Sequence, residues 1–189
     1  MSQSSMLSAV EIATDRLLLR KARDTDRERL IELQTDPQVW AYLGGPRRRE
    51  AVEKRLDAIG GAGNATAVPG AFVIADRASD DLIGTLGLKR PTDDLPVHVA
   101  EGGEELKLEL GYLLRRDVWG AGLAAEAASA ALRAAADELP DQPVIIVTQT
   151  ANERSLKLAI RLGFQPVSTF ERSGAEQTLG LARLHSFKA

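Results

Sequence analysis

The chain has 189 residues and a formal net charge of −3 at pH 7, which fits one domain with a sizeable core and argues against a nucleic-acid-binding surface. Its composition, 44% hydrophobic and 27% charged, is that of an ordinary globular protein. The absence of cysteine excludes disulfides, a thiol nucleophile and a cysteine-ligated zinc site.

The first segment, residues 1–13, is rich in serine and has neither a basic start nor a sustained apolar core. It is not typical of a secretory signal, and we expect a flexible N-terminal tail. A single domain is expected over residues 14–189, with no internal repeat. No segment approaches the ~18 consecutive apolar residues of a membrane span, so we expect a cytoplasmic protein that does not bind membranes.

Three elements are predicted in the first part of this domain. Residues 16–20 indicate a strand, and residues 24–33 show the apolar spacing of a helix with Asp24 or Thr25 as its N-cap. A second helix is predicted over residues 47–59.

The second predicted helix opens with three consecutive arginines, Arg47, Arg48 and Arg49. Such a run can bind a phosphate group or simply be a solvated surface, and both interpretations stay open. Residues 60–70 contain too much glycine for a regular element and indicate a mobile loop.

A hairpin and a long loop come next. Residues 72–75 and 82–88 indicate two strands joined by the turn signal at residues 78–81. Residues 91–104 are acidic and contain proline and glycine, which indicates a loop. This loop can be a lid over a binding cleft, or a disordered or dimer-contacting segment.

The central stretch, residues 105–139, is organised as a strand, a glycine pair and a helix. Leucines alternate with other residues up to Leu114, the period-2 pattern of a strand with one buried face. The helix expected from Gly122 to Leu139 has no further glycine or proline and is dominated by alanine. At Gly120 and Gly122 a backbone without Cβ lets a ligand approach, and free amide N–H groups at the helix start suit a phosphate.

The last third of the chain is predicted to add three strands and one helix. The strands are expected at residues 144–148, 164–170 and 177–184, and the helix at residues 152–162 with Gly163 as its C-cap. His98 and His185 are far apart and neither belongs to a ligand-spaced cluster, so we expect no metal site.

The glycine pair admits two phosphate-binding interpretations. The string from Gly120 to Ala125 satisfies the dinucleotide fingerprint G-x-G-x-x-G/A. That fingerprint should follow its strand directly, whereas residues 115–119 intervene here, and the strand at 144–148 ends without the acidic residue that binds a ribose. A nicotinamide-binding fold is therefore disfavoured.

Several short motifs carry the second interpretation, a family resemblance. They are ELGY at Glu109–Tyr112, WGAGLAAEA at Trp119–Ala127, NERS at Asn152–Ser155 and LGF at Leu162–Phe164, together with Thr14–Arg20 and Asp36–Pro46. In order and spacing they resemble the GNAT superfamily of acyl-CoA-dependent N-acyltransferases, and within it the branch of the ribosomal-protein N-terminal acetyltransferases. The likeness runs from about Thr14 to about Leu184.

The resemblance implies an α/β (α+β) fold, with a mixed, mostly antiparallel sheet of about six to seven strands that is splayed at an acyl-CoA cleft and flanked by about four helices. It also implies acetyl-CoA as the cosubstrate, with no metal. The residues expected to bind it are Leu113 and Leu114 through backbone amides, Gly120, Ala121, Gly122, Leu123 and Ala124 in the phosphate turn, and Asn152.

The phosphate turn departs from the family pattern at one position. The family usually has Gln or Arg three residues before the first glycine, and this chain has Asp117. An acid facing a pyrophosphate is unfavourable, so we expect Asp117 to point away and Arg115 or Arg116 to supply the positive charge.

A second departure concerns the general acid. Many family members carry Tyr seven residues after the Asn of the last helix, where this chain has Ala159. The branch often has Ser at the position of Ser155, which lies one turn from Asn152 and can hydrogen-bond the leaving thiol. Both residues have ordinary structural roles as well, a helix cap for Asn152 above all. Glu109 is the candidate general base, or else a solvent-facing strand residue.

The expected activity is transfer of an acetyl group from acetyl-CoA to a primary amine. Without a strong base, an N-terminal α-amine with a pKa near ~8 fits better than a lysine near ~10.4. The alternatives are a small amine such as a polyamine, an amino sugar or an amino-acid derivative, and a non-catalytic acyl-CoA-binding module. Trp40 and Tyr42 can wall the acceptor cleft or pack in the core, and the protein can be a monomer or a homodimer.

Overall fold

The computed structural model describes residues 6–91, 95, 103, 105–106 and 108–188. Most of the acidic loop expected at residues 91–104 lies outside the described residues, as does His98. Among the described helices, none is long and apolar enough to cross a membrane.

One eight-stranded sheet in the order β1-β2-β3-β4-β5-β6-β8-β7 forms the centre of the molecule. Every neighbouring pair is antiparallel except β5 and β6, which are parallel. The strands are β1 (Glu11–Ala13), β2 (Leu17–Arg20), β3 (Ala71–Asp76), β4 (Leu82–Lys89), β5 (Leu108–Leu114), β6 (Pro143–Gln149), β7 (Gln165–Arg172) and β8 (Ala175–Arg183). The mixed, mostly antiparallel sheet is confirmed, with eight strands where about six to seven were expected.

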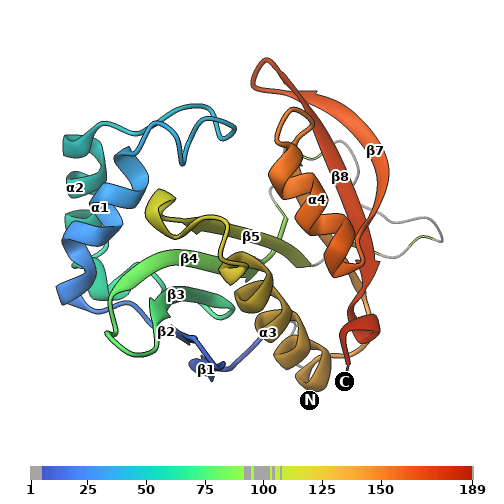
Figure 1. Ribbon diagram of the computed structural model, residues 1–189, viewed down its shortest axis with the longest axis horizontal. Helices are drawn as coiled ribbons and strands as arrows, with labels where there is room; N and C mark the ends of the chain where they lie inside the picture. The colour runs from blue at the N-terminus through green and yellow to red at the C-terminus, as the bar shows by residue number, and fades with distance from the viewer. Residues whose placement is uncertain (1–5, 92–94, 96–102, 104, 107, 189) are drawn as a thin grey trace.

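Four α-helices lie within the described residues and cover the two faces of the sheet (Figure 1). They are α1 (Arg27–Thr35), α2 (Arg49–Ala58), α3 (Leu123–Glu138) and α4 (Glu153–Leu162). Helices α1 and α2 cover one face of the sheet, where they pack against side chains of β3 and β4 such as Val73 and Leu82. Helices α3 and α4 share a second, larger core on the opposite face.

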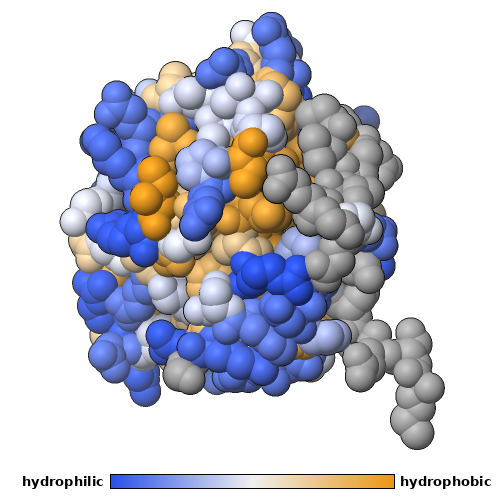
Figure 2. Space-filling view, turned by 90° about the vertical axis from the view of Figure 1, so that its right-hand side faces the viewer, coloured by the Kyte–Doolittle hydropathy of each residue, from blue (hydrophilic) through white to orange (hydrophobic). Residues whose placement is uncertain are grey.

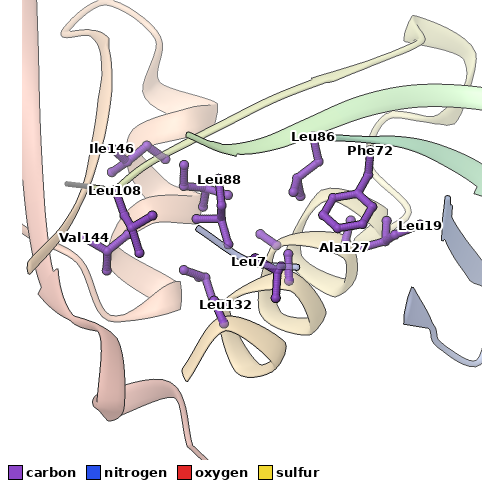
Figure 3. Close-up of a cluster of buried hydrophobic side chains, with 14 of the residues drawn as sticks. Leu7, Leu19, Phe72, Leu86, Leu88, Leu108, Ala127, Leu132, Val144 and Ile146 are labelled. Carbon is purple, nitrogen blue, oxygen red and sulfur yellow. The ribbon is translucent and has the colours of Figure 1, made fainter. Parts of the chain in front are cut away.

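Alanines let α3 lie close to the sheet. Its buried residues, spaced at the helical period, are Ala127, Ala128, Ala131, Leu132, Ala135 and Ala136. Five of the six are alanine, so the helix backbone approaches the strands, and the large side chains that fill the core come from the strands, for example Phe72 and Leu108 (Figure 3). This packing explains why an alanine-rich stretch forms the central helix.

The N-terminal segment differs from the flexible tail expected over residues 1–13. From Met6 onward it is part of the fold: Leu7 is fully buried in the core beside α3 (Figure 3), and Glu11–Ala13 form the edge strand β1. Burial of Leu7, packing of Met6, Ala9 and Ile12 against the same core, and pairing of β1 with β2 order this segment.

The opposite edge of the sheet is β7, on the side of the molecule shown in Figure 2. Hydrophobic surface lies there among polar residues, and Val167 of β7 is 55% exposed. The strand contains Pro166, and its register with β8 shifts between Pro166 and Ser168. Proline and a bulge both hinder pairing with a further strand, so this edge is protected against sheet extension.

Candidate functional site

Strands β5 and β6 diverge in the middle of the sheet. Within the described residues they pair only at Leu108 with Val144 and at Glu109 with Ile145. Beyond this point β5 stays paired with β4, and β6 with β8 (Figure 1). The backbone groups on the facing edges of the two strands are thus no longer bonded across the sheet, which confirms the expected splaying.

The hydrogen-bond pattern of β5 shows which of its backbone groups face the divergence. The amide of Arg115 donates to the carbonyl of Ile83 at 2.8 Å. Because an antiparallel ladder alternates, the amide and carbonyl of Leu113 also point toward β4, whereas those of Tyr112 and Leu114 point away from it. The structure therefore differs from the expectation for Leu113, whose amide and carbonyl point toward β4 within the sheet. The amide of Leu114 instead faces the gap between β5 and β6.

Both leucine side chains are packed against other hydrophobic residues. Leu114 belongs to the core under α3, and Leu113 packs against the core under α1 and α2. The carbonyl of Leu114 accepts a hydrogen bond from Trp119 Nε1 at 2.9 Å, and the guanidinium of Arg154 in α4 lies 5.3 Å from the Trp119 ring centre. Trp119 thus fixes the end of β5 relative to the glycine turn and to α4.

The turn that precedes α3 contains two glycines, so its backbone is not covered by side chains at these positions. Gly120 and Gly122 have φ angles of +83° and +78°, a region that only glycine adopts without strain. The first helical bond runs from the amide of Glu126 to the carbonyl of Gly122, so the amides of Leu123 and Ala124 have no partner within the helix. A Cβ at Gly120 would meet nothing within 4 Å. Open amides at the positive end of a helix fit a pyrophosphate.

The charges around this turn bear on the expectation for Asp117 and the two arginines. Asp117 is held by Arg115 at 2.7 Å, and Arg115 also binds Asp81 at 2.8 Å, so the positive charge of Arg115 is already shared between two carboxylates. The Arg116 side chain is exposed and makes no hydrogen bond or ion pair with any described residue, whereas its carbonyl accepts from the Trp119 amide. Of the two arginines proposed to supply charge, only Arg116 remains available.

A third arginine, which sequence reasoning missed, lies directly at the turn. The Nη1 atom of Arg16 donates to the carbonyl of Ala121 at 2.9 Å, and its Nη2 atom is 3.8 Å from the position of a Cβ at Gly122. The Arg16 side chain is 52% exposed. Its only signal in the sequence was its place in the Thr14–Arg20 motif.

At the start of α4 three polar side chains form a chain of contacts. The Oδ1 atom of Asn152 accepts from the amide of Ser155 at 3.3 Å, which makes Asn152 the N-cap of the helix. The Oγ atom of Ser155 accepts from the Tyr112 hydroxyl at 3.2 Å. Tyr112 comes from β5, so this bond joins β5 to α4 beyond the point where β5 and β6 separate. Sequence reasoning did not assign a role to Tyr112.

Glu109 lies at the last β5–β6 pair, where the strands separate. It is half-buried, and its Oε2 atom is shielded from solvent. Strand alternation puts it on the face opposite Tyr112. Since Ser155 contacts Tyr112, Glu109 and Ser155 lie on opposite sides of the sheet at its divergence.

The residues expected to wall the acceptor cleft differ in exposure. Trp40 is half-buried, and its Nε1 donates to the carbonyl of Leu33 at 3.0 Å, which supports the packing interpretation. Tyr42 is 41% exposed. Beside this segment an open groove of about 320 Å³ runs between α1 and the turn after β5, lined by Glu32, Leu33, Asp36, Val39, Arg115, Arg116 and Asp117.

No group of three or more His, Asp and Glu side chains that could hold a metal ion is found in the part of the chain that the structure describes. His185 bonds through Nε2 to the carbonyl of Leu139, at the C-terminal end of α3 and away from the glycine turn.

Comparison with known proteins decides the family. The model of the acetyltransferase (GNAT) domain matches residues 16–165, which is most of the chain. The chain belongs to the GNAT acetyltransferase family. The uncharacterized N-acetyltransferase p20 of Bacillus licheniformis is 27% identical over 159 residues, which cover 80% of each protein. This GNAT protein is therefore an acetyl-CoA-dependent N-acetyltransferase, and the non-catalytic alternative is not retained.

Solved structures share the fold of this GNAT protein. The GNAT-family acetyltransferase from Bacillus anthracis has a TM-score of 0.73 and 19% identity, covering 92% of this chain and 98% of its own. The ribosomal L7/L12 α-N-protein acetyltransferase RimL has a TM-score of 0.63 and 15% identity, covering 91% and 93%. The spermidine N-acetyltransferase from Vibrio cholerae has a TM-score of 0.67 and 14% identity, covering 92% and 99%.

Proposed function

We propose that this enzyme acetylates the α-amino group of a protein or peptide N-terminus. The observation that carries the proposal is Glu109, a half-buried carboxylate at the point where β5 and β6 separate. A carboxylate is a weak base, so the acceptor amine has to lose its proton easily, and an α-amine with a pKa near ~8 does so more readily than lysine near ~10.4. The likeness of motifs to the ribosomal-protein branch and of fold to RimL supports the same acceptor.

The residues proposed to bind acetyl-CoA are those around the divergence and the glycine turn. The amides of Leu123 and Ala124 and the bare backbone at Gly120 and Gly122 fit the pyrophosphate, with Ala121 between the two glycines. The amide of Leu114 is proposed to polarise the thioester carbonyl, a role in which a single donor is worth about 3–4 kcal/mol. Arg116 and Asn152 complete the proposed set.

The chain supplies three further functions for acetyl transfer. Glu109 takes a proton from the ammonium form of the acceptor, directly or through water. Ser155 hydrogen-bonds the departing sulfur from the other side of the sheet, and Tyr42 with the groove beside α1 contacts the acceptor. Base and leaving group are thereby separated by the thickness of the sheet at its divergence.

A second acceptor class, a small polyamine, is favoured by a different observation. The groove beside α1 is lined by the carboxylates of Glu32, Asp36 and Asp117, which suit a cationic ligand. The neighbouring fold of a spermidine N-acetyltransferase is consistent with this acceptor. Arg115 and Arg116 in the same groove oppose it.

The test measures thiol release from acetyl-CoA with matched acceptors. One peptide has a free N-terminus and no lysine, its partner has a blocked N-terminus and one lysine, and spermidine is the small amine. We expect turnover with the first peptide and acetyl on its α-nitrogen by mass spectrometry. We expect Glu109→Gln to lower kcat about 100-fold at neutral pH, and Glu105→Gln, an exposed neighbour, to leave it unchanged.

Two outcomes contradict the proposal. Acetyl found on the internal lysine of the blocked peptide would show that the acceptor is a side-chain amine. Turnover with spermidine and neither peptide would replace the peptide acceptor by the polyamine.

A further inference from the structure

The hydroxyl groups of Tyr112 and Ser155 meet across the divergence of the sheet. Tyr112 is on β5 and Ser155 is in the first turn of α4, and the phenol donates to Ser155 Oγ at 3.2 Å. Both residues are half-buried. The bond thus sits between the two halves of the sheet, next to the edge where the thioester is proposed to lie.

Ser155 has a proton to give in this arrangement. Its Oγ accepts the hydrogen bond from Tyr112, and its backbone amide donates to Asn152 Oδ1. Among the described residues no carbonyl or side chain accepts a bond from the Ser155 hydroxyl. The hydroxyl can therefore donate to a ligand atom while it continues to accept from Tyr112.

Tyr112 is a protonated donor under physiological conditions. Burial raises the pKa of the Tyr112 phenol, and the Ser155 hydrogen bond and the charge of Arg161 lower it by less. A neutral phenol keeps its proton available for Ser155 through the pH range in which α-amines are acetylated. A serine hydroxyl alone is a poor acid, and a phenol behind it supplies the missing proton source.

We propose that Tyr112 and Ser155 form a proton relay to the leaving sulfur. As the carbon–sulfur bond breaks, the Ser155 O–H bond breaks and its proton goes to sulfur, while the Tyr112 O–H bond breaks and its proton goes to Ser155 Oγ. The phenolate then takes a proton from water, which restores both hydroxyls. The relay rests on acetyl transfer with Ser155 at the sulfur, and it is independent of the choice of acceptor.

The position of Ala159 is consistent with this relay. Ala159 is 5% exposed and lines a small cavity beneath α4 with Ile146 and Phe164. This position of α4 carries no group that can donate a proton, whereas one turn earlier Ser155 meets a tyrosine that arrives from β5. Tyr112 thus supplies a phenol to the first turn of α4 from a different element.

The first test compares Tyr112→Phe, Ser155→Ala and the double variant, with Thr178→Val as a control. Tyr112→Phe keeps the ring and removes only the hydroxyl. Thr178→Val removes one hydroxyl of another hydroxyl–hydroxyl hydrogen bond, the one between Thr178 and Thr150 at 2.8 Å. We expect each relay variant to lower kcat by about 100-fold, the double variant to be no worse than the more damaged single one, and Thr178→Val to keep kcat.

Binding gives a readout that does not depend on turnover. Calorimetry with CoA and with desulfo-CoA, which lacks the sulfur, separates a sulfur contact from general damage. We expect Tyr112→Phe and Ser155→Ala to weaken CoA several-fold and to leave desulfo-CoA unchanged. Equal weakening of both ligands would overturn the relay, because it would mean that the Tyr112–Ser155 bond only braces the fold.

The phenol itself can be titrated in the folded protein. The chain has two tyrosines, so Tyr42→Phe leaves Tyr112 as the one phenol that absorbs as phenolate near 295 nm. We expect ionisation above the ordinary value of 10.0 and a further rise when Ser155→Ala is added. An ordinary value that Ser155→Ala does not move, or wild-type kcat in Tyr112→Phe, rejects the relay. If the wild-type enzyme released no thiol from acetyl-CoA with any of the acceptors, the proposed function itself would be rejected.

Discussion

Arg16 holds Glu126 through three of its nitrogen atoms. Its amide donates to Glu126 Oε1 at 3.1 Å, its Nε donates to Oε2 at 2.7 Å, and its Nη2 lies 2.6 Å from the same Oε2. Glu126 is in the first turn of α3, so its charge would otherwise oppose an anion at the glycine turn. Arg16 neutralises that carboxylate and also binds the carbonyl of Ala121, which fixes the turn.

The first prediction concerns Glu126 and pH. Burial raises the pKa of Glu126, but the hydrogen bonds from Thr14 and Arg16 outweigh it, and the net pKa lies below the ordinary 4.5. A lowered carboxyl pKa adds stability above pH 4.5 that is lost as the pH falls through the folded-state pKa. Glu126→Gln should cost about 2 kcal/mol at pH 7 and little at pH ~3, measured by urea unfolding across pH.

Glu153→Gln is the matched control for this prediction. Glu153 pairs with Lys157 at 3.2 Å, and both side chains are largely exposed, so its removal should change stability by less than about 0.5 kcal/mol. A Glu126→Gln effect that stays constant from pH 7 to pH ~3 would show that the cost is packing and not charge.

The second prediction concerns the hydrogen bond between Trp119 and Leu114. Trp119→Phe keeps a ring under Arg154 but removes the Nε1 donor to the Leu114 carbonyl, which fixes the end of β5. We expect a loss of about 1 kcal/mol in stability and a rise of about five-fold in the KM for acetyl-CoA. Trp40→Phe removes an equivalent bond to Leu33 away from the glycine turn, and its KM for acetyl-CoA should not change.

The third prediction compares a buried ion pair with an exposed one. Arg20 and Asp26 are 3% and 5% exposed and share two hydrogen bonds of 2.8 and 3.0 Å. Asp26→Ala should cost about 3 kcal/mol in urea unfolding, because it leaves a buried guanidinium with Asp80 as its remaining carboxylate partner. Asp57→Ala, which breaks the exposed pair with Arg27, should cost less than about 1 kcal/mol. Equal costs would contradict the role assigned to burial.

The fourth prediction is that a tyrosine at position 159 does not act as a general acid. Ala159 is buried beside a cavity of only about 10 Å³, so Ala159→Tyr should overpack the core and cost about 1–3 kcal/mol. Ile160→Tyr, at a position that is 58% exposed, should change stability by less than about 0.5 kcal/mol. Higher kcat in Ala159→Tyr with unchanged thermal stability would show that the side chain reaches the cleft.

Periodicity and local capping rules predicted most of the fold. The alternating leucines of β5, the alanine face of α3 and the caps at Asn152 and Gly163 are local features, and each is found where the sequence placed it. The N-terminal segment was misjudged because its order depends on distant partners, the core that buries Leu7 and the strand β2 that pairs with β1. A short segment that packs through a few side chains and a three-residue strand leaves no clear periodic signal.

Of the candidate site, the sequence predicted the part that is built from the backbone and missed side chains with distant partners. The glycine turn at residues 120–124 could be located from the sequence, because Gly120 and Gly122 have positive φ, and its binding of a pyrophosphate stays a proposal. Arg16 and Tyr112 were missed because their partners, Ala121 and Ser155, are 105 and 43 residues away in the chain. The different roles of Leu113 and Leu114 depend on the register with β4, which neither leucine specifies by itself.

The short pairing of β5 with β6 also limits how cooperatively the apoprotein can unfold. The two halves of the sheet are joined there by two described residue pairs, and α3 bridges them, touching β1, β2, β4 and β5 on one side and the turn at Leu184–Phe187 on the other. A strand pairing this short is a place where local opening costs less free energy than global unfolding. A cosubstrate that contacts both halves would stabilise this junction, so the enzyme with acetyl-CoA bound should unfold more cooperatively than the apoprotein.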